Sequence, residues 1–258
     1  MSGLALQQQT IWLTGASSGI GEALAKALQP LCKHLYVSAR SEDKLADLAN
    51  AHSNVTALAV DVTDPESVRN AAEFIQNHGG LDTVIANAGT CEYVDVDDFD
   101  TRLIERVMQT NFIGLAHCVE AALPLLKNSQ AGYLVAVSSS STWLAMPRAQ
   151  AYGASKAAVN YFMESMAADL KHIGIDVSVV LPGFVKTPLT DLNDFPMPMM
   201  ITAEDAAERI ISGLEKRRFA IHFPQRFTLI LKLLGLLPAP LRLKLSSRMS
   251  RLPQGSSS

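Results

Sequence analysis

A tyrosine and a lysine that stand four residues apart, Tyr152 and Lys156, are the side chains of this sequence best suited to proton transfer. Residues four apart share one face of a helix, so a phenol and an ammonium placed there can reach a common substrate. Free tyrosine titrates near ~10, but a fixed positive charge nearby favours the phenolate and lowers that pKa. We expect Tyr152 to serve as a general acid-base beside Lys156, although the same spacing also occurs on solvated helices and needs support from other motifs.

That support comes from a glycine-rich turn, Thr-Gly-Ala-Ser-Ser-Gly-Ile-Gly, at residues 14–21. It follows the first apolar run and opens an amphipathic stretch, although its spacing departs from G-x-G-x-x-G. Glycines let the backbone approach a pyrophosphate, and the free amides and dipole of a helix N-terminus attract negative charge. The turn therefore predicts a dinucleotide site, and its expected contacts are Gly15, Ser17, Ser18, Gly19, Ile20 and Gly21.

Short apolar runs alternate with amphipathic stretches along the chain. The runs, each typical of a strand buried on both faces, are residues 11–13, 35–37, 55–60, 83–86, 133–137 and 177–181. The stretches of helical period are residues 20–28, 42–51, 66–77, 101–127 and 154–172. Alternation of this kind indicates βαβ units. We expect an α/β fold: one doubly wound, Rossmann-type domain over residues 1–258, with a mostly parallel sheet flanked by helices.

Thr-Gly-x-x-x-Gly-x-Gly, followed far downstream by Tyr-x-x-x-Lys, resembles the short-chain dehydrogenase/reductase family in its single-domain form. The resemblance extends over about residues 9–190. Further matches in the family's order are Asp61, Asn87-Ala88-Gly89, Asn111, a serine run at residues 138–141 and Pro182-Gly183. Ala86 departs from the family, whose members often carry a second Asn there, and we expect little effect because the following Asn-Ala-Gly is intact.

The resemblance implies how the catalytic residues act. In the family, a hydride passes between the nicotinamide and a carbonyl or carbinol carbon, and tyrosine moves the oxygen's proton. Tyr152 matches that tyrosine, and Lys156 is expected to lower its pKa and to bind the nicotinamide ribose. Physical reasoning does not choose among the four serines, but the family's interval of 13 residues before the tyrosine selects Ser139 to polarise the substrate oxygen. Asn111 matches the residue that holds a water between lysine and solvent, and it is also compatible with a helix kink or cap.

Arg40, at the end of the second apolar run, bears on the choice of cofactor. NAD-specific relatives usually place an acid there for the ribose hydroxyls, whereas a guanidinium can pair with a 2′-phosphate. We expect NADP(H) to be preferred, with NAD(H) as the alternative if Arg40 is only a solvated residue beside Glu42 and Asp43. Asp61 matches the family's adenine contact, or it forms a turn and helix cap. The other expected cofactor contacts are Asn87, Ala88, Gly89, Tyr152, Lys156, Pro182, Gly183, Val185 and Thr187, the last two beside the nicotinamide amide.

Residues 184–203 occupy the position of the family's substrate-covering loop. They include Phe195 and several methionines, whose flexible side chains can shape an apolar pocket or simply pack on the body. A second loop, Trp143 to Pro147, is a candidate lining of the same cleft. Both favour a small apolar carbonyl or alcohol as substrate, including a lipid-like or 3-oxoacyl compound. A catalytically silent NADP-binding sensor, or a membrane-associated binding protein, is the alternative function on this fold.

The C-terminal segment, residues 216–258, is basic and leucine-rich. It holds nine of the chain's 22 Lys and Arg and no Asp or Glu. Its apolar run, residues 227–237, is too short to span a bilayer. It either lies in a membrane interface, as a peripheral contact, or packs on the body or on a second subunit. Relatives are usually homodimers or homotetramers, often through the two long helices that begin near Thr101 and Ala154. Residues 253–258 have the composition of a disordered end.

Composition sets limits on other function classes. With 48% hydrophobic and 18% charged residues, the chain is globular rather than disordered. The three cysteines, Cys32, Cys91 and Cys118, have no C-x-x-C spacing and suit reduced thiols. The six histidines form no spaced ligand set, so no metal is expected, and the leucine-rich tail does not indicate nucleic acid. The first nine residues lack a signal-like pattern, which predicts a cytoplasmic protein, with peripheral attachment to the inner face of a membrane as the alternative.

Overall fold

The computed structural model describes residues 5–41, 43–191, 193 and 195–249. In these residues, seven strands form one sheet in the order β3-β2-β1-β4-β5-β6-β7, and every neighbouring pair is parallel. The strands are β1 (Thr10–Thr14), β2 (His34–Ala39), β3 (Val55–Ala59), β4 (Thr83–Ala86), β5 (Tyr133–Val137), β6 (Asp176–Pro182) and β7 (Ala220–Phe223). The predicted doubly wound α/β fold is confirmed, and the predicted strands are present. The seventh strand was not predicted, because it has four residues and includes His222.

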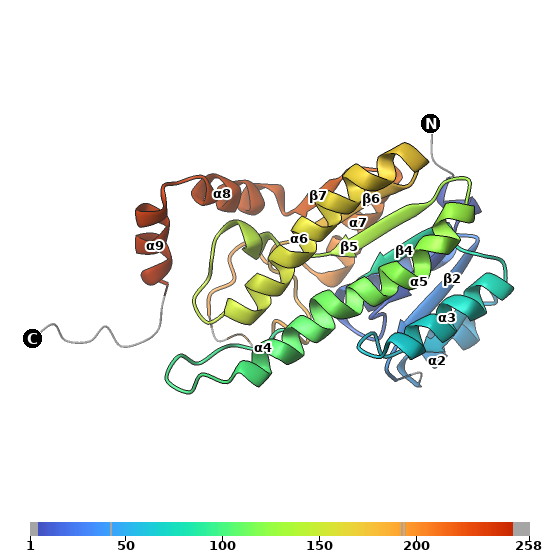
Figure 1. The fold of residues 1–258 in the computed structure, drawn as a ribbon, viewed down its shortest axis with the longest axis horizontal. Helices are drawn as coiled ribbons and strands as arrows, with labels where there is room; N and C mark the ends of the chain where they lie inside the picture. The colour runs from blue at the N-terminus through green and yellow to red at the C-terminus, as the bar shows by residue number, and fades with distance from the viewer. Residues whose placement is uncertain (1–4, 42, 192, 194, 250–258) are drawn as a thin grey trace, which may run out of the picture.

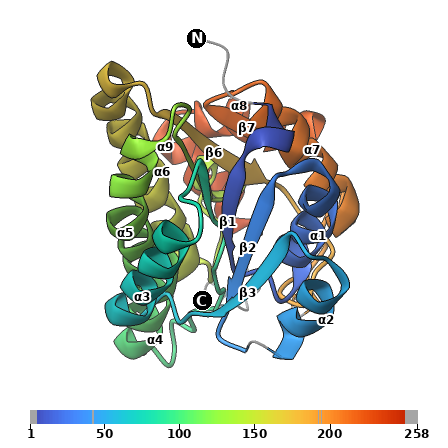
Figure 2. The same ribbon diagram turned by 90° about the vertical axis from the view of Figure 1, so that its right-hand side faces the viewer.

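Helices cover both faces of the sheet (Figures 1 and 2). In Figure 2, α1 (Gly19–Leu28), α2 (Asp43–Ala51) and α7 (Ala203–Glu215) lie on one side. The other side carries α3 (Pro65–Asn77), α4 (Thr101–Met108), α5 (Gly114–Asn128) and α6 (Gln150–Leu170). Two more helices follow the last strand, α8 (Gln225–Gly235) and α9 (Ala239–Ser247). The sequence pattern missed α7, and it placed the start of α6 four residues late. The predictions on Glu42 and on residues 253–258 lie outside the described residues.

The helix expected over residues 101–127 is interrupted between α4 and α5. A π-helical segment, Gln109–Ile113, joins the two helices, and Asn111 lies buried within it. Segments of this kind widen one turn of a helix and are frequent at functional sites. The interruption therefore places the Asn111 side chain inward rather than on the regular helical face.

The strands are buried on both faces, as their unbroken apolar runs predict. All five residues of β1 and all five of β5 are buried. Successive side chains along a strand point to opposite faces, so Ile11 and Leu13 enter the core under α1 and α7, whereas Trp12 enters the core under α3, α5 and α6. Trp12 also donates a hydrogen bond from Nε1 to Ser38 Oγ at 3.0 Å, which satisfies its buried polar atom.

Leu134, the second residue of β5, is fully buried, so it provides a test of this core. We expect Leu134→Ala to lower the free energy of unfolding by about 2–5 kcal/mol, because it removes buried methyl groups and leaves a cavity. Urea denaturation followed by circular dichroism measures the change. Leu243→Ala, at a position 68% exposed on α9, is the matched control and should change stability by less than about 0.5 kcal/mol. Equal losses in the two variants would contradict the assignment of β5 to the core.

Candidate active site

A cleft of about 830 Å³ lies where the parallel strands end. The loops after β1, β4, β5 and β6 meet there, because the carboxyl ends of parallel strands share one edge of the sheet. The predicted site residues that line it are Gly15, Ser17, Ser18, Gly19, Ile20, Gly21, Arg40, Asp61, Asn87, Ala88, Gly89, Ser139, Tyr152, Lys156, Pro182, Gly183, Val185 and Thr187. Asn111 is the predicted site residue that does not line the cleft; it lies buried behind it.

The glycine-rich turn is held tightly against the loop after β4. Gly15 has φ +68°, and a Cβ there would lie 2.7 Å from the Ala88 Cα. Gly21 is closer still to its surroundings, since a Cβ would meet the Gly15 carbonyl oxygen at 2.1 Å. Asn87 Nδ2 donates to the carbonyl oxygens of Thr14 and Gly15, at 3.1 Å each. The motif glycines are thus required by close packing, which leaves the free amides of the first turn of α1 facing the cleft.

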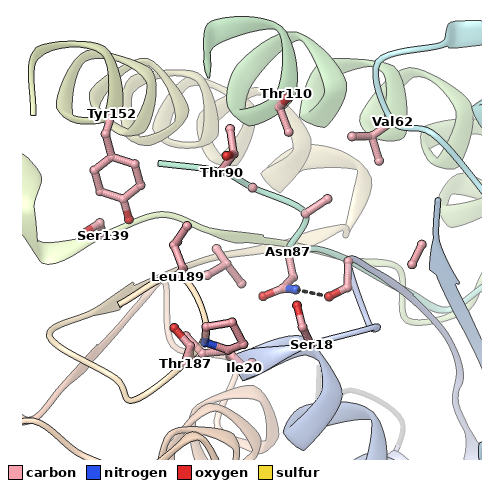
Figure 3. A pocket seen from close by; sticks show the side chains of 18 of the residues that line it. Ser18, Ile20, Val62, Asn87, Thr90, Thr110, Ser139, Tyr152, Thr187 and Leu189 are labelled. Atoms are coloured by element: carbon pink, nitrogen blue, oxygen red, sulfur yellow. Dashed lines mark hydrogen bonds between the residues drawn. The ribbon is translucent and has the colours of Figure 1, made fainter. Parts of the chain in front are cut away.

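The hydroxyl of Tyr152 points toward Ser139 in the cleft (Figure 3). Tyr152 stands in the first turn of α6, and Ser139 is the hydrogen-bonding side chain that acts on the pKa of its phenol. Ser139 follows β5, and its Oγ also accepts a hydrogen bond from Ser141 N at 3.1 Å. The neighbouring Ser138 donates to the Lys156 carbonyl oxygen at 3.0 Å. Of the four serines in the run, Ser139 alone is paired with the phenol of Tyr152.

Lys156 is almost completely buried, one turn after Tyr152 on α6. Its Nζ donates to the Val137 carbonyl oxygen at 2.8 Å and lies 6.0 Å from the centre of the Tyr152 ring. Burial lowers the pKa of Lys156 to about 8, because the charged form loses its hydration. The ammonium therefore loses its proton far more readily than a solvated lysine does.

The expected lowered pKa of Tyr152 is not found in the protein by itself, where the pKa lies above its usual value. Burial raises the pKa of Tyr152 to about 12, and the hydrogen bond with Ser139 offsets only part of this effect. The cause is that tyrosine and lysine share one poorly hydrated site, where burial penalises both charged forms. Near neutral pH, Tyr152 is therefore a phenol, and the site holds a proton donor rather than a base.

Asn111 connects three elements of the site. Its Nδ2 donates to Thr90 O and to Ser155 Oγ, both at 2.9 Å, and its Oδ1 accepts from Thr90 N at 2.7 Å. A Cβ on Gly89 would lie 3.3 Å from both Asn111 Oδ1 and Lys156 Nζ. These contacts tie the loop after β4 to α6 directly behind the lysine. The water expected at Asn111 remains a prediction.

Asp61 and Arg40 lie at the other end of the cleft. Asp61 Oδ1 accepts from Thr63 N at 2.9 Å and from Thr63 Oγ1 at 2.8 Å, so the expected turn is formed. The cap of α3 is Asp64, which accepts from Glu66 N at 2.9 Å. Burial acts to raise the pKa of Asp61, but the Thr63 hydrogen bonds and the charge of Arg40 together hold it below its usual value. Asp61 is therefore ionised and fixed in place, with the exposed Arg40 guanidinium nearby.

The two loops expected on the substrate side pack elsewhere. Among the described residues, those that line the cleft include none of residues 143–147 or 195–200. Trp143 and Leu144 pack with Phe227 of α8, and the Phe195 ring meets the Phe184 ring at 5.9 Å. The expectation that both loops line this cleft was wrong for this cavity: Trp143 and Leu144 pack against α8, whereas Met199 and Met200 are exposed. Residues 184–203 approach the cleft instead through Val185, Thr187, Pro188, Leu189 and Thr190.

Several lining residues were missed by the sequence patterns, and most of them adjoin a predicted one. Among them are Val62, Thr63, Thr90, Thr110 and Leu189, of which four are labelled in Figure 3. Thr90 follows the Asn-Ala-Gly motif, and Thr110 precedes Asn111. Their proximity in sequence was a usable signal, whereas their side-chain types gave none.

None of the described helices is long and apolar enough to cross a membrane.

The sheet order and the cleft at its carboxyl edge define a doubly wound, dinucleotide-binding type of α/β protein. A family model described as short chain dehydrogenase matches residues 9–194. The chain belongs to the short-chain dehydrogenase/reductase family, and it is an oxidoreductase of that family.

Relatives extend the match to most of the chain. An uncharacterized oxidoreductase of Myxococcus xanthus is 32% identical, over 92% of this chain and 95% of its own length. The 11-beta-hydroxysteroid dehydrogenase 1A of Arabidopsis thaliana is 31% identical, over 86% of this chain and 70% of its own. A short chain dehydrogenase from Burkholderia cenocepacia, crystallised in complex with NADP, has a TM-score of 0.82 at 25% identity and covers 95% of this chain and 99% of that one. A short chain dehydrogenase/reductase from Burkholderia phymatum in complex with NAD has a TM-score of 0.81 at 23% identity, over 89% of this chain and 94% of that one, and it supports the fold alone.

Proposed function

We propose that the protein transfers a hydride between NADP(H) and a small apolar carbonyl or alcohol compound. The observation that carries this proposal is the pairing of the Tyr152 phenol with Ser139, beside the buried Lys156, in the same cleft as the glycine-rich turn. A proton donor, a hydrogen-bond donor for a substrate oxygen and a phosphate cradle together fit carbonyl reduction.

The cleft fits a dinucleotide. The tight approach of Gly15 and Gly21 to their neighbours leaves no room for a side chain, and this keeps the free amides at the start of α1 open to a pyrophosphate. At one end lie Asp61 and Arg40, with chemistry suited to an adenosine ribose and its phosphate. Val185 and Thr187 line the cleft as well, with Thr187 close to Gly19, and they are proposed to hold the nicotinamide amide.

The chain's own residues would manage the proton and the orientation of the substrate. A bound nicotinamide supplies or accepts the hydride. Ser139 donates a hydrogen bond to the substrate carbonyl oxygen, while Tyr152 gives that oxygen its proton. Lys156, while charged, stabilises the phenolate that Tyr152 becomes, and its Nζ is also placed to bind a ribose hydroxyl. Asn111 holds the loop after β4 against helix α6 through hydrogen bonds to Thr90 and Ser155, close to Lys156.

Arg40 supports NADP(H) as the preferred cofactor, and the NADP-bound relative from Burkholderia cenocepacia agrees with it. NAD(H) remains the alternative cofactor. The apolar residues of the segment 184–203 that line the cleft, Val185, Pro188 and Leu189, favour an apolar substrate. Residues 184–203 are proposed to cover that substrate. Assembly as a homodimer or homotetramer in the cytoplasm completes the proposal.

The pH dependence of kcat/KM should differ in sign between the two directions of the reaction. For reduction, Tyr152 is protonated at all working pH values because its pKa is about 12, so kcat/KM should stay level below pH about 8. Above about pH 8 it should fall, because Lys156 loses the charge that stabilises the phenolate. Alcohol oxidation needs the phenolate, so its kcat/KM should rise with pH. Initial rates in both directions between pH 6 and about pH 10 measure this, and a reduction rate that rises with pH would contradict it.

The proposal is tested by titrating the full chain with NADPH and NADH and then following absorbance over a panel of apolar ketones, aldehydes and 3-oxoacyl thioesters. NADPH-selective binding with turnover is the expected result. Tight NADPH binding without turnover on any member would instead support a silent sensor. No binding of either nucleotide would reject both functions.

A further inference from the structure

Helix α8 is apolar on two opposite faces. Its inner face packs on the protein through Phe227, Leu231 and Leu234, against Trp143, Leu144 and Phe184. Gly235 lets the helix approach closely, since a Cβ there would lie 2.3 Å from the Trp143 carbonyl oxygen. The inner face therefore packs on the body, as one of the two alternatives for this leucine-rich segment predicted. It buries only some of the segment's apolar side chains.

The outer face of α8 is a stripe of exposed aliphatic side chains. Leu229, Ile230 and Leu233 lie on one side of α8 at the spacing i, i+1 and i+4, and Leu236 and Leu237 follow directly after the helix ends at Gly235. The five residues are Leu229, Ile230, Leu233, Leu236 and Leu237, and their exposure ranges from 36% to 77%. Such a contiguous patch is uncommon on an ordinary surface and marks a site of contact with a partner or a membrane.

Positive charges border this outer face. Arg226 and Lys232 lie on α8, and α9 adds Arg242 and Lys244, with Arg248 directly after it. The sequence has no Asp or Glu from residue 216 onward, so no acid of this segment offsets these charges. Helix α9 has no buried residue and exposes Leu241 and Leu243. It is tied to the body by Leu245, in the apolar cluster of α8, and by Ser246 Oγ, which donates to Ala145 O at 2.8 Å.

We propose that the outer face of α8, with the cations of α8 and α9, binds the surface of an anionic lipid bilayer. Leucines would enter the boundary between headgroups and acyl chains, while the long Arg and Lys side chains reach the lipid phosphates. With 11 residues, α8 lies in the interface rather than crossing it. Figure 1 shows α8 and α9 at one end of the molecule, away from the helices that cover the sheet, where a flat surface can reach them.

Charge favours a bilayer over a second copy of this chain as the occupant. In a twofold contact, the same patch meets itself. The cations of α8 and α9 would then face one another without an acid of their own segment between them. Lysine is also depleted in the core of protein interfaces. The rest of the chain carries all 25 acidic residues, so an anionic surface would repel the body and attract this end alone.

Flotation of the full chain with lipid vesicles tests the proposal. We expect binding to vesicles of phosphatidylcholine with phosphatidylserine, much weaker binding to phosphatidylcholine alone, and loss of binding in high salt. The double variant Leu233→Gln/Leu236→Gln should bind about tenfold more weakly, because it removes inserted apolar side chains. Lys232→Glu should lose a similar factor on anionic vesicles only. Neither variant touches the cleft, so failure here and failure of the proposed oxidoreductase activity are distinguishable.

Ile173→Gln is the matched control, since Ile173 is 45% exposed near the carboxyl end of α6. It should bind vesicles as the native chain does. Indifference of the native chain to anionic vesicles would overturn the proposal, and so would binding that the α8 variants leave unchanged. Light scattering gives the remaining outcome: a dimer that Leu233→Gln dissociates, without flotation, would assign this face to a second copy and also overturn the proposal.

Discussion

Tyr152→Phe should bind NADPH nearly as well as the native chain does and lose turnover by about 10²–10⁴-fold. The substitution keeps the ring in its place on the first turn of α6 and removes only the hydroxyl that faces Ser139. The hydride step would then leave an alkoxide without a proton donor, because Lys156 is hydrogen-bonded to Val137 and its Nζ lies 6.0 Å from the ring. Fluorescence titration with NADPH and steady-state reduction rates separate binding from chemistry.

Tyr161→Phe provides the control, because Tyr161 lies on the same helix but is 79% exposed. Its turnover and NADPH affinity should equal those of the native chain. If Tyr152→Phe retained near-native turnover, another group would have to supply the proton. The proposed roles of Ser139 and Lys156, which depend on Tyr152, would then be wrong as well. If it lost NADPH binding as well, Tyr152 would be a positioning residue for the cofactor rather than the acid.

The sequence predicted the fold well where one physical signal dominated. Runs such as residues 133–137 are apolar throughout, and this pattern is typical of a strand covered on both faces. Helix α7 was missed although Thr202 caps it and its buried residues recur with helical period. Strand β7 was missed for the opposite reason. Strand β7 is short and includes a half-buried His222, so its burial depends on α7 and α8 packing over it rather than on its own pattern.

The sequence predicted which residues form the candidate site, but it did not predict the pKa values of its titratable groups. The spacing of the glycine-rich turn and of Tyr152 with Lys156 brought together residues that line one cleft. The pKa of Tyr152 was mispredicted, because helical spacing gives the distance to a charge but not the hydration that both groups lose. The helix kink that the sequence allowed at Asn111 is present as a π-helical segment, but its hydrogen bonds to Thr90 and Ser155 were not predictable, because these residues are distant in sequence.

Arg40→Asp should reverse the preference between the two nucleotides. Arg40 lies at the end of β2, lines the cleft and is exposed, so its guanidinium is free to turn toward a 2′-phosphate. Hydrogen bonds to a charged group contribute about 1.5–3 kcal/mol each. Loss of such bonds, together with repulsion from a new carboxylate, should weaken NADPH binding by about 100-fold or more. NADH affinity should stay level or improve, because an acid at this position can accept hydrogen bonds from the ribose hydroxyls.

Lys44→Asp is the matched control, because it makes the same change of charge at an exposed position on α2 that does not line the cleft. It distinguishes a direct contact with the 2′-phosphate from a long-range effect of charge on NADPH binding. A long-range effect of charge would weaken NADPH binding in both variants and would fade with added salt. A direct contact predicts a large loss in Arg40→Asp alone, still present at moderate salt. Equal NADPH affinities of Arg40→Asp and the native chain would reject Arg40 as the phosphate ligand. The cofactor would then be held by groups common to both nucleotides, such as the turn from Gly15 to Gly21, and the protein would not discriminate between them at this position.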